Sequence, residues 1–169
     1  MGAHGTTLHD VFIVVHSNFE KNSRTQSNPT GNEVYKNERE GNLLARFCVA
    51  VAQICISVGC HFTLENPRGS WMWRLPEFVD LANHAHVHFA FFPMCAFGTN
   101  YLKRTAFLTN AQWCMRSIGG LRCTCKKKHV ILQGFTTDPS TGKRIKRTAL
   151  AAAYPARLCK ALVDAAANP

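Results

Sequence analysis

Short apolar segments alternate with longer amphipathic ones along this chain, and this alternation is the feature that most limits its possible folds. Runs rich in β-branched and aromatic residues predict strands at 11–15, 61–65, 87–92 and 105–109. Apolar residues at helical spacing predict helices at about 41–58, 76–83, 111–117 and 154–167. Strands that alternate with helices are typical of α/β proteins. We therefore expect a Rossmann-like, mostly parallel sheet flanked by helices.

Charge divides the chain unevenly. Residues 1–99 hold 7 Lys or Arg and 8 Asp or Glu, a net charge of −1, whereas residues 100–169 hold 13 and 2, a net charge of +11. We expect residues 1–118 to form the α/β domain and residues 119–169 to form a basic loop and a C-terminal helix that packs on it. Such an excess of positive charge favours a polyanionic partner.

The hydropathy pattern also bears on location. No apolar run reaches the roughly 18 residues that a membrane span needs, and residues 1–10 lack a basic region followed by an apolar stretch. We therefore expect an intracellular protein without a membrane partner, nuclear if the source is eukaryotic. In that setting the eight cysteines are expected to be reduced thiols. The sequence does not specify an oligomeric state.

Two unusual segments follow predicted strands. Residues 65–70 read Glu-Asn-Pro-Arg-Gly-Ser, and residues 95–98 read Cys-Ala-Phe-Gly. The carboxyl ends of strands in open parallel sheets form ligand crevices. A carboxylate there must be paired with a cation, exposed to solvent or used in the function of the protein, because burying it alone costs free energy. Glu65 is thus either a functional carboxylate or an ordinary strand-end residue beside the turn at Asn66-Pro67.

The ordered series resembles DNA (cytosine-5)-methyltransferases of the phage and mobile-element type. It comprises the Glu65-Asn66-Pro67 turn, the Cys95–Gly98 segment, the basic step Lys103-Arg104-Thr105 and the closing Thr109-Asn110, within a match from about Gly41 to Asn110. The resemblance implies part of an S-adenosylmethionine-dependent methyltransferase fold. It also implies S-adenosylmethionine as cofactor and a cytosine flipped out of duplex DNA as substrate. Glu65 would contact the ring N3, Asn66 and Pro67 would support Glu65, and Arg68, Lys103 and Arg104 would contact phosphate or the base.

The sequence departs from this family at two positions. The glycine-rich cofactor loop is not found ahead of the matched region, and the loop Val15-His-Ser-Asn-Phe-Glu20 lacks the Pro-Cys nucleophile. We therefore expect a divergent or truncated methyltransferase-like domain with weak or no activity as an isolated chain. The alternatives are a non-catalytic, nucleic-acid-binding relic of a mobile-element protein and a structural interaction protein.

Basic clusters after residue 118 suggest contact with duplex DNA, because lysines and arginines neutralise backbone phosphates. Few aromatic residues lie between them, so stacking on single-stranded bases is not expected. A nuclear-localisation signal is the other interpretation. The cluster residues are Lys126, Lys127, Lys128, Lys143, Arg144, Lys146 and Arg147.

Cysteine and histidine side chains in the same region suggest one possible metal set. Cys114, Cys123, Cys125 and His129 could hold a structural zinc ion in a Cys3His arrangement. The Cys-x-Cys spacing is less common in zinc sites than Cys-x-x-Cys. We therefore favour ordinary thiols in a basic loop and do not expect zinc.

Overall fold

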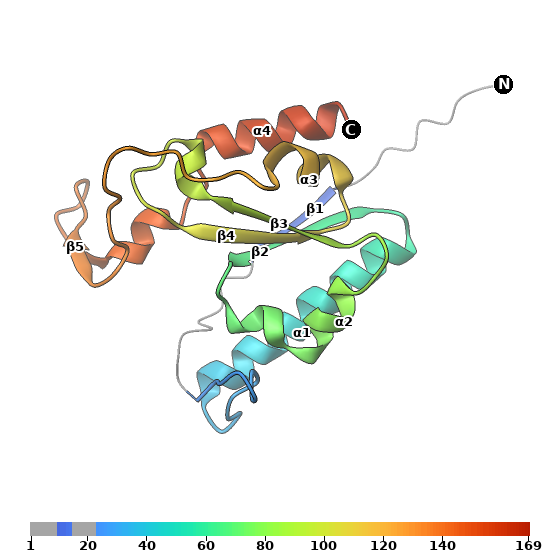
Figure 1. Ribbon diagram of the computed structural model, residues 1–169. Coiled ribbons are helices and arrows are strands. Elements are labelled where there is room, and N and C mark those ends of the chain that lie inside the picture. The colour runs from blue at the N-terminus through green and yellow to red at the C-terminus, as the bar shows by residue number, and fades with distance from the viewer. Residues whose placement is uncertain (1–9, 15–22) are drawn as a thin grey trace.

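A computed structural model describes residues 10–14 and 23–169 of the chain. These residues form four α-helices, six strands and three short 3-10 helices (Figure 1). The strands are β1 (Asp10–Val14), β2 (His61–Pro67), β3 (His88–Pro93), β4 (Arg104–Thr109), β5 (Phe135–Thr137) and β6 (Arg144–Lys146). The α-helices are α1 (Lys36–Ser57), α2 (Pro76–Ala82), α3 (Gln112–Ile118) and α4 (Ala156–Ala167). The 3-10 helices are η1 (Trp71–Arg74), η2 (Met94–Phe97) and η3 (Arg147–Ala151).

The main sheet corrects the expected fold class. Its strand order is β1-β2-β4-β3, and only β1 and β2 pair in parallel, whereas β4 is antiparallel to both β2 and β3. A second, two-stranded sheet pairs β5 with β6, also antiparallel. The expectation of a Rossmann-like, mostly parallel sheet is therefore wrong: most pairings in this molecule are antiparallel.

The physical reason lies in the connection between β3 and β4. Parallel strands need a crossover of about a dozen or more residues, usually a helix. Here the chain reverses through η2 and the short segment that follows it, with Gly98 in the left-handed region at φ 90°. The long apolar strand sequences reflect burial on both faces of the sheet, which does not fix strand direction.

Helices cover both faces of the sheet (Figure 1). On one face, α1 and α2 pack against Phe62, Leu64 and Leu108. On the other face, α3 and α4 pack against Phe92 and Phe107. The alternation of side chains along each strand therefore supplies two separate apolar cores.

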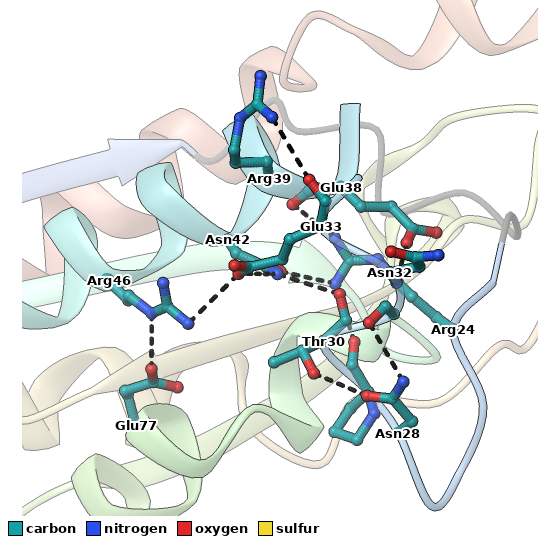
Figure 2. Close-up of polar contacts among 12 residues, drawn as sticks. Arg24, Asn28, Thr30, Asn32, Glu33, Glu38, Arg39, Asn42, Arg46 and Glu77 are labelled. Atoms are coloured by element: carbon teal, nitrogen blue, oxygen red, sulfur yellow. Dashed lines mark hydrogen bonds and ion pairs between the residues drawn. The ribbon is translucent and has the colours of Figure 1, made fainter. Parts of the chain in front are cut away.

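Helix α1 begins at Lys36, earlier than the expected start near residue 41. A loop just before it is held to its first turns by a buried polar network (Figure 2). The Arg24 guanidinium donates to the Pro29 carbonyl (2.9 Å) and to Asn42 Oδ1 (2.9 Å). The Glu38 carboxylate accepts from the backbone N–H and the hydroxyl of Ser23 at 2.8 and 2.6 Å. These contacts order a polar segment that has no apolar face to bury.

Among the described residues, α1 is also the one helix long and apolar enough to cross a membrane by length and composition. In the structure its inner face, with Ala45, Cys48 and Ala52, packs in the core. Its outer face exposes several apolar side chains. The exposed residues are Leu43, Leu44, Phe47 and Ile54, together with Val58 directly after the helix.

Candidate nucleic-acid interface

Glu65 lies near the carboxyl end of β2, opposite Phe107 of β4, on the sheet face that α3 and α4 cover. Its side chain is 6% exposed, and its Oε1 lies 3.3 Å from Nζ of Lys103, which is 20% exposed. Lys103 directly precedes β4. The antiparallel direction of β4 places this lysine at the edge where β2 ends. A buried carboxylate thus has its cation, as the cost of burying charge requires.

Tyr154, which precedes α4, lies against the same site. Burial raises the pKa of Tyr154, and the negative charge of Glu65 raises it further. The hydroxyl faces this carboxylate, but the contact lacks the geometry of a well-formed hydrogen bond. Glu65 is therefore enclosed between Lys103 and Tyr154.

Asn66 and Pro67, expected to form a turn, are instead the last two residues of β2, and the turn follows at Arg68-Gly69. Asn66 is buried, and its amide contacts Met72 Sδ at 3.5 Å on the opposite face of the sheet from Glu65. The Pro67 carbonyl accepts from Nε1 of Trp73 at 2.9 Å and from the backbone of Ser70 at 2.9 Å. These contacts therefore fix the end of β2 and the position of the next residue, Arg68.

An open cleft of about 400 Å³ lies at this edge of the sheet, a volume within the usual range of ligand sites. Three arginines line it: Arg68 after β2, Arg104 at the start of β4, and Arg122 from the segment after α3. The backbone N–H of Arg68 donates to the Arg104 carbonyl at 2.9 Å, which fixes two of them side by side. Across residues 23–169, none of the three forms an ion pair with a carboxylate.

Aromatic and apolar groups form part of the cleft wall. The Arg68 guanidinium lies 4.5 Å from the ring centroid of Phe91, a cation–π arrangement. Phe91 is 36% exposed and stacks on Phe89 with a centroid distance of 5.4 Å. Pro93 and Leu102 complete this side. The cleft therefore offers three arginines that have no carboxylate partner among the described residues, beside flat apolar surface.

The other predicted basic residues lie in the C-terminal third. Lys126, Lys127 and Lys128 are exposed on an irregular segment. The second cluster lies on the β5–β6 ribbon, which extends from the body of the molecule (Figure 1). Its Arg144 packs on the Phe135 ring at 4.1 Å, and its Arg147 donates to the Phe135 carbonyl at 3.2 Å. Lys143 and Lys146, from the same cluster, are exposed.

Cysteine and histidine side chains meet beside the cleft. The ligand atoms of Cys95, Cys123, Cys125 and His129 all lie within 4.8 Å of one another. Cys95 is buried in η2, and the other three come from the irregular segment after α3. Cys114, a member of the set suggested by the sequence, is not part of this cluster. It is fully buried in the core on α3.

The cluster perturbs the acidity of its thiols. Burial, together with the Cys123 and Cys125 sulfurs, raises the pKa of Cys95 to about 12. A hydrogen bond from the backbone of Cys125 lowers the pKa of Cys123, and the charge of Arg104 lowers it further. Neighbouring thiols resist joint ionisation unless a cation compensates their charge.

The structure brings together several of the residues singled out in the sequence: Glu65 with Lys103, Arg68 with Arg104, and Cys123 with Cys125 and His129. The closing Thr109-Asn110 pair has a structural role, because Asn110 Oδ1 accepts from the backbone of Phe62 at 2.8 Å. Sequence reasoning missed Arg122 and Tyr154 as site residues, and Cys95 as a possible ligand. The sequence does contain a signal for Cys95, because this residue follows the end of a strand. Cys114, in contrast, shares a helical apolar stripe with Ala111 and Ile118.

The glycine-rich loop that the resemblance assigns to S-adenosylmethionine is not found after β2, β3 or β4. None of the loops directly after β2, β3 or β4 carries two glycines, and Gly119-Gly120 follows a helix. The loop 15–20, where the family's nucleophile was expected, lies outside the described residues.

No family profile, curated protein or solved structure matches this chain.

Proposed function

We propose that this chain binds nucleic acid, duplex DNA in particular, and that the backbone of the bound strand lies across the arginine cleft. One observation carries the proposal: Arg68, Arg104 and Arg122, from three separate segments, converge in one cleft without a carboxylate partner in the described chain. Arginine is suited to this role because its planar fork binds phosphate in a bidentate manner.

The exposed lysines extend this surface. Lys126–Lys128 follow the cleft residues Arg122 and Cys123 closely in sequence, and the basic β5–β6 ribbon adds a second region of charge. Contacts of this kind supply affinity and orientation but little sequence information. We therefore expect strong dependence on salt and weak dependence on base sequence.

Fluorescence anisotropy with a labelled duplex tests the proposal. Each cleft arginine replaced by glutamine should weaken binding and reduce the slope of log K against log salt by about 0.9, the contribution of one phosphate contact. Lys160→Gln is the matched control, since Lys160 is exposed on α4, pairs with Asp164 at 2.8 Å and loses the same charge. If the arginine variants bind like the control, the cleft is not the binding site.

A second candidate function, methyl transfer to cytosine, has one observation in its favour: Glu65 and Lys103, matched from separate motifs, pair at 3.3 Å. The test is incorporation of label from S-adenosylmethionine into duplex DNA, with Glu65→Gln as the variant. Label above background that disappears in Glu65→Gln would favour the enzyme. DNA binding without label would leave the binding function alone.

A further inference from the structure

We propose that Cys95, Cys123, Cys125 and His129 bind one zinc ion, which fastens the segment after α3 to the end of β3. The sequence suggested a different set, with Cys114 as the fourth ligand. The four atoms gathered here come from two segments that are far apart in the chain. One is the 3-10 helix η2, and the other is the irregular stretch that contains the Cys-x-Cys pair and His129.

The geometry suits tetrahedral zinc. With Zn–S bonds of about 2.3 Å and Zn–N bonds of about 2.0–2.1 Å, tetrahedral ligand atoms lie about 3.6–3.8 Å apart. Cys123 Sγ and His129 Nε2 are already 3.6 Å apart. Every other pair lies within 4.8 Å, so shifts of about 1 Å suffice to complete the sphere.

The donor types and their surroundings favour zinc over a hard cation. Three sulfurs and one imidazole are the ligands of structural zinc sites, whereas Mg²⁺ and Ca²⁺ take oxygen ligands. Three thiolates and Zn²⁺ carry a net charge of −1. Arg104 and Arg122 near the cluster, and Lys126 directly after Cys125, offset this charge.

The segment that would be fastened has little else to hold it. Among the described residues, 121–129 contain no helix or strand. Backbone hydrogen bonds tie this stretch to the rest of the fold at its two ends. Gly120 N–H donates to the Phe91 carbonyl of β3 at 3.2 Å, and Val130 N–H donates to the Asn100 carbonyl at 2.8 Å. A metal between these two bonds would fix Arg122 and Cys123 in the cleft wall, so the zinc centre would also shape the proposed DNA site.

Metal analysis of the full chain, purified under reducing conditions and without nucleic acid, tests the proposal. We expect about one zinc ion per chain. Cobalt substitution should give a sulfur-to-cobalt charge-transfer band with the intensity of three thiolates. Cys95→Ser and Cys125→Ser should lose stoichiometric zinc. Cys159→Ser, which removes an exposed thiol outside the cluster, should retain it.

Two further variants keep the result interpretable if a serine variant fails to fold. His129→Ala should lose zinc and His129→Cys should regain it, because only the second restores four ligands. Cys114→Ser tests the set suggested by the sequence. Retention of zinc by Cys95→Ser together with its loss in Cys114→Ser would overturn the assignment. Wild-type chain that binds neither zinc nor cobalt under these reducing conditions would also overturn it. Because DNA is absent, these outcomes are independent of the proposed binding function.

Discussion

Replacing Glu38 by glutamine should lower the free energy of unfolding far more than replacing an exposed glutamate on the same helix would. Glu38 is fully buried, and its carboxylate accepts from Ser23 through two bonds and from the backbone of Asn32 at 2.5 Å. The buried guanidinium of Arg24 lies in the same network and donates to the Glu38 carbonyl at 3.2 Å (Figure 2). An amide in place of the carboxylate removes the negative charge. It also points an NH2 group, itself a donor, at the donor groups of Ser23 and Asn32.

The expected magnitude follows from this arrangement. Hydrogen bonds to a charged group contribute about 1.5–3 kcal/mol, and removing a buried acceptor leaves its donors unsatisfied. The Glu38 carboxylate accepts three such bonds, so we expect a loss of about 3 kcal/mol in the free energy of unfolding. For a chain of this size, that corresponds to a fall in Tm of about 6–12 °C. Urea denaturation at neutral pH measures the first quantity, and a thermal melt measures the second.

The pH dependence of stability gives a second measurement. Burial alone would raise the pKa of Glu38, but the hydrogen bonds from Ser23 and Asn32 and the charge of Arg24 lower it overall. A lowered folded-state pKa contributes stability above the unfolded value of about 4.3, and this stability is lost as pH falls through the folded pKa. Glu38→Gln should therefore flatten the acid limb of the stability profile.

Glu40→Gln is the matched control for Glu38→Gln. Glu40 lies on the same helix, is exposed and pairs with Lys36 at 3.7 Å. Its replacement should cost less than about 0.5 kcal/mol. Equal losses of stability in the two variants, or an unchanged acid limb in Glu38→Gln, would refute the argument that the buried network holds the loop.

Two other substitutions test the packing of the sheet faces. Tyr154→Phe should leave stability unchanged or raise it by up to about 1 kcal/mol, because the buried hydroxyl has no well-formed hydrogen bond to lose. A loss of about 2 kcal/mol in a urea melt would instead show that its contact with Glu65 is a stabilising bond. Leu108→Ala should cost about 2–5 kcal/mol in the same assay, since this fully buried side chain packs between β4 and the helices α1 and α2.

The positions of the elements could be predicted from the sequence because each depends on local pattern. Strands β2 and β4 and helix α2 begin within one residue of the positions that apolar spacing indicates. The start of α1 could not be predicted in this way. Its first turn carries no apolar stripe, and what stabilises it is contact with Ser23 and Arg24, which lie more than ten residues earlier.

The members of the Cys/His cluster were only partly predictable for a similar reason. Cys123, Cys125 and His129 are close in sequence, so spacing alone groups them. The fourth ligand position depends on which distant segment the fold brings near, and both Cys95 and Cys114 were available. Helical periodicity assigns Cys114 to the core, where it lies fully buried. Cys95 lies at the end of a strand, so helical periodicity does not assign it to the core, and it could face the loop.

Strand direction accounts for both the incorrect fold class and the site that exists instead. In a parallel sheet, the start of β4 would lie at the opposite edge from the end of β2, and Lys103 and Arg104 could not reach Glu65 and Arg68. Because β4 runs antiparallel between β2 and β3, Pro67 pairs with Thr105, and Pro93 pairs with Arg104. Cys95, just after β3, lies at this edge as well, because β2 and β3 run in the same direction. The ion pair and the pairing of Arg68 with Arg104 therefore depend on the antiparallel direction of β4.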